Sequence, residues 1–168
     1  RFMEIYDVAE CIICVSDYIK NRVKTISPTD KKAITIYNGI DVERFNRPVH
    51  PISRQELGFA DNDFVAIFTG RVVLGKGIRE LIKAMCLLKK HPHIKLLVVG
   101  TSFLGNNQGH SPFVEELKQL AEEIKDNIIF TGYVDYELVP SYLHLANVAV
   151  VPSVWDEPFG LTCIEALA

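Results

Sequence analysis

The chain has 168 residues, of which 48% are hydrophobic and 23% are charged, and its formal net charge is −3 at pH 7. This length and apolar content normally give one domain with a real core, which argues against a disordered protein. The interspersed charges leave no basic face, which argues against a protein that coats nucleic acid. No apolar run approaches the ~20 residues that span a bilayer, and residues 1–4 do not resemble a secretory signal, so we expect a soluble protein.

Both ends of the sequence are expected to be cut. Residue 1 is not methionine, and Ala168 follows an apolar helical pattern over residues 161–167. Within the first 45 residues, the pattern predicts a strand, a capped helix and a second strand at residues 9–15, 16–23 and 34–37. The stretch that follows is polar and rich in proline, which is typical of a boundary between domains. We interpret residues 1–45 as the tail of a preceding domain and residues 46–168 as a second, truncated domain.

Cys11 and Cys14 form the C-x-x-C spacing of this chain and lie in an apolar run that predicts a buried strand. Residues three apart on a strand face opposite sides of the sheet, which suits neither a metal knuckle nor a redox turn. We therefore expect buried, reduced thiols, and these fit a cytoplasmic protein.

From Asp63 onward, short β-rich runs alternate with helical patterns. Strands are expected at residues 64–70, 95–100, 127–132 and 148–152, and helices at residues 78–90, 112–124, 136–145 and from Pro158 onward. Such alternation predicts a Rossmann-like α/β fold, with a parallel sheet that is covered by helices on both faces.

Small residues collect where these expected strands end, as in Gly70-Arg71, Gly100-Thr101, Gly132-Tyr133 and Pro152-Ser153. Ligands of open parallel sheets bind beyond the carboxyl ends of the strands, and glycine lets a ligand approach the backbone closely. Ordinary tight turns explain any single glycine equally well. Residues 103–110, which follow the second of these strands, are either a functional loop or a plain surface excursion.

The loop after the first of these strands carries two cations, Arg71 and Lys76, directly before a helix. It is not a P-loop, because residue 77 is glycine where G-x-x-x-x-G-K requires Ser or Thr next. A guanidinium and an ammonium that reach over the crevice suit a diphosphate. The alternative is two solvated loop cations.

Pro158 suits the first position of a helix, which would leave the amides of Phe159, Gly160 and Leu161 available to an anion. Glu157 and Glu165 would then be separated by about 12 Å along the helix axis. The two carboxylates of a glycosidase lie only about 5 to 9.5 Å apart, so hydrolysis by this pair is disfavoured. Carboxylates at the two ends of an elongated ligand, with a diphosphate between them, suit a nucleotide sugar.

The sequence resembles the GT-B glycosyltransferases of family four, which are retaining enzymes that build polysaccharides, lipopolysaccharides and glycolipids. The resemblance covers almost the whole chain. Its landmarks are Tyr37-Asn38-Gly39-Ile40-Asp41 with Phe45, Gly70-Arg71 with Lys76-Gly77, Phe130-Thr131-Gly132-Tyr133-Val134, and Glu157-Pro158-Phe159-Gly160 running to Glu165.

The resemblance implies a role for each matching residue. Arg71 and Lys76 would neutralise the departing diphosphate, a task for which other glycosyltransferases use a metal ion. Glu157 would contact the transferred sugar, and Glu165 would hold the ribose hydroxyls. Further donor contacts are expected at Gly70, Gly132, Tyr133, Val134, Ser153, Phe159, Gly160, Leu161 and Thr162.

The expected function is therefore transfer of a sugar from a nucleotide diphosphate, with no metal and no cofactor. A UDP-sugar is favoured because such donors are common in the family. The acceptor, a saccharide or glycolipid, would bind mainly to the preceding domain, and we expect the fragment alone to be inactive. Three alternatives stay open: a donor-binding module without activity, a nucleotide-sugar epimerase and a sugar phosphorylase. Peripheral contact with the inner face of a membrane also stays open.

Overall fold

The computed structural model describes residues 6, 8–26, 32–48, 50–102 and 111–168. The candidate loop at residues 103–110 therefore lies outside the described residues. The chain divides into two compact units. The first unit comprises residues 1–40 and 156–161, and the second unit comprises residues 41–155 and 162–168. The assignment of residues 1–45 to a preceding domain stays a prediction.

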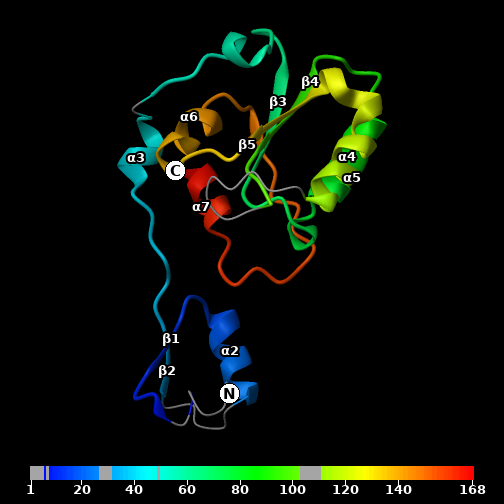
Figure 1. The fold of residues 1–168 in the computed structure, drawn as a ribbon. Coiled ribbons are helices and arrows are strands. Elements are labelled where there is room, and N and C mark those ends of the chain that lie inside the picture. The colour runs from blue at the N-terminus through cyan, green and yellow to red at the C-terminus, as the bar shows by residue number, and fades with distance from the viewer. Residues whose placement is uncertain (1–5, 7, 27–31, 49, 103–110) are drawn as a thin grey trace. The chain divides into compact units, whose positions relative to one another are not determined.

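The second unit is built on a four-stranded sheet in the order β5-β4-β3-β6, of which Figure 1 labels β3, β4 and β5. Its strands are β3 (Phe64–Thr69), β4 (Ile94–Val99), β5 (Ile128–Gly132) and β6 (Val148–Ala149). Each neighbouring pair is parallel, which confirms the parallel sheet. The carboxyl ends of all four strands therefore lie at the same edge.

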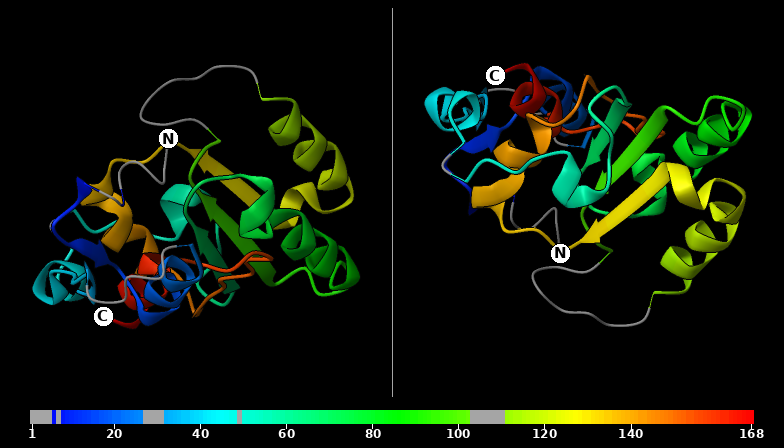
Figure 2. Two further views of the ribbon diagram at one scale, coloured as in Figure 1. Left: turned by 90° about the horizontal axis from the view of Figure 1, so that it is seen from below. Right: turned by 90° about the horizontal axis from the view of Figure 1, so that it is seen from above.

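Helices cover both faces of this sheet because alternate residues of β3 and β4 point to opposite sides. Helices α4 (Ile78–Leu87) and α5 (Pro112–Leu120) lie next to each other, as Figures 1 and 2 show, and pack against Phe68 and Val98. Helix α6 (Val139–Leu143) contributes to the core on the opposite face, which includes Ile67 and Leu97. The expected α/β architecture is thus confirmed.

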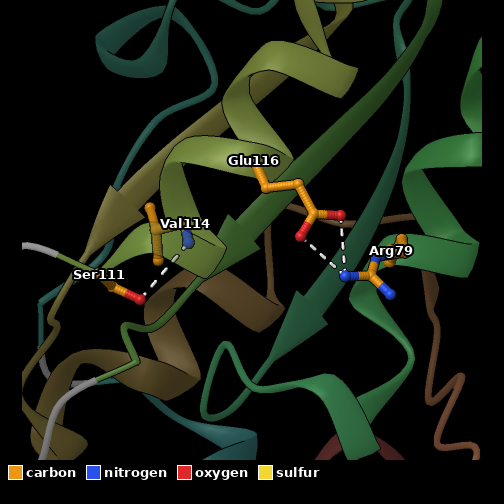
Figure 3. A network of polar contacts seen from close by, with 4 residues as sticks. All are labelled: Arg79, Ser111, Val114 and Glu116. Atoms are coloured by element: carbon orange, nitrogen blue, oxygen red, sulfur yellow. Dashed lines mark hydrogen bonds and ion pairs between the residues drawn. The ribbon is translucent and has the colours of Figure 1, made fainter.

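Helices α4 and α5 are joined by an ion pair, in which Arg79 and Glu116 approach to 2.8 Å (Figure 3). Ser111 caps α5 by accepting a hydrogen bond from the amide of Val114 at 3.4 Å, and Pro112 begins the helix. Cap and proline are those that the sequence predicts. The helix ends at Leu120, and a short 3-10 helix, Glu122–Asn127, takes the place of its expected last turn.

The helix expected at residues 136–145 is two pieces, a 3-10 helix at Tyr136–Leu138 and then α6. The break follows from Pro140, which has no N–H to donate to the carbonyl of Tyr136 as a continuous α-helix would require. Tyr136, in the first of these pieces, lines the pocket described below.

The helix expected from Pro158 begins only at Leu161, so the prediction of its first turn is wrong. Gly160 has a φ of +84°, in the left-handed region, so the chain before Leu161 cannot be helical. Helix α7 (Leu161–Leu167) is consequently one turn shorter at its start than the sequence pattern indicates.

The segment before β3 is tied to the sheet by one arginine. Arg54 donates hydrogen bonds to the carbonyl oxygens of Leu145, Asp61 and Asp63 at 3.0, 3.1 and 3.0 Å. Its remaining guanidinium nitrogen donates to Asn147 Oδ1 at 2.9 Å. The chain entering β3 and the chain entering β6 are therefore held together through one side chain.

In the first unit, strands β1 (Ile12–Cys14) and β2 (Ala33–Thr35) pair in parallel. Helix α2 (Asp17–Ile26) lies between them in the chain and forms a small core with them. Asp17 accepts hydrogen bonds from Thr35 Oγ1 and the hydroxyl of Tyr37 at 2.6 and 2.7 Å, which lower its pKa. Each of the three elements overlaps its predicted range, but β1 is shorter than the expected residues 9–15 and α2 extends beyond the expected residue 23.

The four cysteines, all within the described residues, are unpaired. Cys14 is buried as expected, but Cys11 is exposed, so the prediction of two buried thiols is wrong for Cys11. The reason is that β1 begins only at Ile12, which leaves Cys11 outside the sheet.

Across the described residues, the longest apolar helix is too short for a membrane crossing.

Candidate functional site

A pocket of about 300 Å³ lies at the carboxyl edge of the sheet in the second unit. The ends of β3 and β4, the turn after β5, and helix α7 all contribute to it. Its walls are formed by Thr69, Gly70, Arg71, Val99, Gly100, Thr101, Tyr133, Val134, Tyr136, Val139, Thr162 and Glu165. Six of the expected site residues are therefore brought together: Gly70, Arg71, Tyr133, Val134, Thr162 and Glu165.

The acidic side of the pocket is Glu165, which is only 7% exposed on α7. The hydroxyl of Tyr136 donates a hydrogen bond to Glu165 Oε1 at 2.9 Å. Burial of the phenol, with this carboxylate beside it, raises the pKa of Tyr136 to about 12. The hydroxyl of Tyr136 is thus neutral at physiological pH and donates its hydrogen bond to the carboxylate of Glu165.

Tyr136 and Val139 are wall residues that the sequence analysis missed. The available signal was an aromatic residue three positions after Tyr133, within a segment that reads as an ordinary helix. Tyr136 lies in the 3-10 piece before α6, and a periodic pattern does not reveal that the two pieces are separate.

The strand ends approach each other closely at the base of the pocket. The amide of Gly100 donates to the carbonyl of Gly132 at 3.0 Å, and a β-carbon at Gly100 would overlap the carbonyl of Gly70. Close packing of the two strand ends therefore requires glycine at residue 100. Gly132 accepts this hydrogen bond but does not itself form part of the pocket wall.

The two charged residues of the cationic loop, residues 70–77, lie in different surroundings. Arg71 is exposed and lines the pocket, whereas the ammonium of Lys76 lies 5.7 Å from the centre of the Trp155 ring. The amide of Val154 donates to the carbonyl of Gly75 at 3.0 Å, so this loop docks on the segment that follows β6. Ser153 belongs to that segment, and neither Ser153 nor Lys76 is a wall residue of the pocket.

Glu157, Phe159, Gly160 and Leu161 belong to the first unit, in the segment 156–161. Residues of the same unit hold this segment. Ser16 Oγ donates to the carbonyl of Pro158 at 2.5 Å, and the hydroxyl of Tyr18 donates to Asp156 at 2.6 Å. The rings of Tyr37 and Phe159 lie 6.2 Å apart.

The geometry expected for the segment 157–165 needs correction. Because Gly160 is left-handed and α7 starts at Leu161, the amides of Phe159 and Gly160 are not those of a first helical turn. The helical separation of Glu157 and Glu165 does not apply either.

The described residues contain no group of three His, Cys, Asp or Glu side chains placed to hold a metal ion.

The family model for glycosyl transferases group 1 matches residues 49–168. This chain belongs to that family. A relative with 30% identity over 175 residues is the uncharacterized glycosyltransferase MJ1607 of Methanocaldococcus jannaschii, and the match covers 100% of this chain and 42% of the relative. The lipopolysaccharide 1,2-N-acetylglucosaminetransferase of Salmonella typhimurium is 28% identical, over 98% of this chain and 43% of the relative.

The structure of HepE from Anabaena in complex with UDP-glucose matches this group 1 chain with a TM-score of 0.77 at 23% identity. The match covers 95% of this chain and 42% of HepE. The fold is therefore the GT-B type that the resemblance implies. The chain spans about two fifths of the length of the curated relatives it matches.

Proposed function

We propose that this protein is a retaining glycosyltransferase that moves a sugar from a nucleotide diphosphate, preferably a UDP-sugar, to a saccharide or glycolipid acceptor. One observation carries the proposal: the pocket at the sheet edge combines the cation of Arg71 with the carboxylate of Glu165. A volume of about 300 Å³ suits part of a small organic ligand. Its position beyond the strand ends is where α/β sheets bind nucleotides.

Different wall residues of the pocket suit different parts of such a donor. Glu165 offers acceptor oxygens to the ribose hydroxyls, and Tyr133 with Val134 offers an aromatic and an apolar surface to the base. Arg71 lies at the end of β3, where its guanidinium can bind phosphate oxygens in pairs. Glu157 is proposed to contact the transferred sugar.

The proposed chemistry needs stabilisation of the leaving group. The bond between the anomeric carbon and the diphosphate oxygen breaks, and the acceptor oxygen bonds to that carbon while its proton passes to the departing diphosphate. Negative charge then grows on the diphosphate, where Arg71 and Lys76 would stabilise it. These fixed cations are proposed to act without a metal ion or a cofactor.

The nature of the donor and the acceptor draws support from the relatives. HepE was crystallised with UDP-glucose, and the Salmonella relative is named as a lipopolysaccharide transferase. We propose that the acceptor binds mainly outside this chain, and that any contact with a membrane surface is peripheral.

Calorimetric titration with UDP, GDP and ADP in the presence of EDTA tests the donor site. We expect one of the three to bind, and Arg71→Ala and Glu165→Ala each to weaken it about tenfold. Arg79→Ala and Glu116→Ala are the matched controls, because they remove the same charges from the α4–α5 pair outside the pocket. Both controls should bind within about twofold of the parent chain.

The proposal would be wrong if a folded protein bound none of the nucleotides, or if both pocket variants bound as tightly as the controls. Release of nucleoside diphosphate from the sugar donor, measured on the full-length protein with EDTA and an extract that contains saccharide and glycolipid acceptors, then separates an enzyme from a binding module. A product whose anomeric configuration matches that of the donor would support retention.

A further inference from the structure

Glu165 is held at a defined position by a neighbouring side chain. Within the described residues, its carboxylate accepts a hydrogen bond from the hydroxyl of Tyr136, at 2.9 Å from Oε1. Glu165 is 7% exposed, and both residues line the same pocket. A carboxylate with one oxygen held in this way presents its other lone pairs in a fixed direction.

The ring of Tyr136 is in turn held from two sides. The guanidinium carbon of Arg44 lies 4.8 Å from the ring centre, which is a cation–π contact. The ring of Phe45 meets it edge-on, with the centres 5.9 Å apart and an angle of 64°. Phe45 is 3% exposed, so this second contact is part of a core rather than of the surface.

Arg44 and Phe45 occupy helix α3 (Val42–Asn46), whose position is also determined by neighbouring residues. Asp41 caps α3 by accepting from the amide of Arg44 at 3.2 Å. A ring nitrogen of His144 lies 2.8 Å from the carbonyl oxygen of Phe45, and Arg44 forms an ion pair of 2.6 Å with Glu137. These contacts attach α3 to both pieces of the broken helix that carries Tyr136.

We propose that Tyr136 is a positioning residue, which orients Glu165 toward the ribose hydroxyls of the nucleotide and is itself held by Arg44 and Phe45. The inference rests on the proposed function, because it assigns a ribose-binding role to Glu165. It also explains a feature that the function alone does not require, namely why the polar segment at residues 38–48 contains a buried aromatic residue, Phe45. Tyr136 therefore determines selectivity for the sugar of the nucleotide, through Glu165.

The test compares a nucleoside diphosphate with its 2′,3′-dideoxy analogue by calorimetric titration, using whichever of UDP, GDP and ADP binds best. Tyr136→Phe removes the hydroxyl but keeps the ring between Arg44 and Phe45. Tyr142→Phe is the matched control, because Tyr142 lies on the adjacent helix α6 but outside the pocket wall.

We expect the parent chain and Tyr142→Phe to prefer the ribonucleotide by about tenfold, and Tyr136→Phe by less than about threefold. Affinity of Tyr136→Phe for the dideoxy analogue should change by less than about twofold, since that ligand lacks the hydroxyls concerned. The ratio of two affinities measured on one protein does not depend on its folded fraction. A partly unfolded variant therefore still reports the preference.

The outcomes separate the two claims. If Glu165→Ala loses the preference but Tyr136→Phe retains it, the positioning role is wrong while the donor site stands. If the parent chain binds a nucleoside diphosphate no more tightly than its 2′,3′-dideoxy analogue, the positioning role of Tyr136 is also wrong. A parent chain that binds none of the three nucleotides would overturn the proposed function and this inference together.

Discussion

Gly77 lies directly against Pro152: a β-carbon added to Gly77 would overlap the carbonyl oxygen of Pro152. Gly77 ends the 3-10 helix Leu74–Lys76 with a φ of +70°, and Pro152 follows the last strand of the sheet. The cationic loop and the segment after β6 can approach this closely only because the loop ends in glycine. The position of Lys76 is therefore linked to the end of a strand distant in sequence.

Replacing Gly77 by alanine should lower the free energy of unfolding by about 3 kcal/mol, from backbone strain together with the overlap. Gly58→Ala is a matched control, because Gly58 also ends a 3-10 helix with a positive φ of 80° but has open space around its α-carbon. That variant should lose only about 1 kcal/mol. Urea denaturation measures both, and equal losses would show that the contact with Pro152 is unimportant.

Trp155 is expected to support Lys76. Its ring lies 5.7 Å from the ammonium, and a β-carbon at Gly75 would come within 2.8 Å of the same ring. Trp155→Ala should weaken binding of the nucleoside diphosphate about threefold, whereas Trp155→Phe, which keeps an aromatic face, should stay within about twofold. Titration calorimetry measures these affinities. An unchanged affinity of Trp155→Ala for the nucleoside diphosphate would mean that the ring does not position Lys76.

Arg54 should be important for stability rather than for binding. Arg54→Ala removes the donor from three carbonyl oxygens and leaves Asn147 Oδ1 with only the amide of Val65, so we expect a loss of about 3 kcal/mol in the free energy of unfolding. Arg54→Lys should recover only part of this stability, because one ammonium cannot make all the hydrogen bonds of the planar guanidinium. The exposed Arg47 serves as control, with a change below about 0.5 kcal/mol in Arg47→Ala. If urea denaturation showed comparable losses of unfolding free energy for Arg54→Ala and Arg47→Ala, the stabilising role of Arg54 would be contradicted.

The raised pKa of Tyr136 predicts a dependence of stability on alkaline pH. The folded value, about 12, lies above the ordinary value of 10.0, so the neutral phenol is favoured by folding. Its contribution should be complete below about pH 10 and be lost as the pH rises toward 12. Because the residue is 50% exposed, screening should hold the contribution below about 1 kcal/mol.

The comparison of the parent chain with Tyr136→Phe isolates this contribution from that of the other titrating groups. Urea denaturation between about pH 9 and about pH 12 should show the stability difference between the two proteins decreasing as pH rises. A difference that stays constant over this range would show that the phenol titrates normally.

Much of the fold could be predicted from local patterns. The strands β3, β4 and β5 and the start of α5 are where periodicity, the cap Ser111 and Pro112 place them. The errors concern single residues whose effect depends on the backbone. Pro158 suits the first turn of a helix, but the left-handed Gly160 delays α7 to Leu161. Cys11 lies in an apolar run but before the first strand residue.

The site was predictable where it consists of strand ends, because parallel strands bring their carboxyl ends to one edge whatever the loops do. That argument assembles Gly70, Arg71 and Tyr133 around one pocket. It does not extend to Tyr136, which lies in the 3-10 piece before α6 and whose ring contacts Arg44 and Phe45.

By itself, the sequence determined the class of fold, the edge at which a ligand should bind and the types of charged group present there. Hydrophobic period, caps and glycine positions are properties of neighbouring residues, so they can be recognised without coordinates. Only the tertiary structure decided which charged groups share a pocket, as Arg71 and Glu165 do, and which aromatic residue holds the carboxylate. Those contacts join residues far apart in the chain, and their geometry depends on the packing of every element between them.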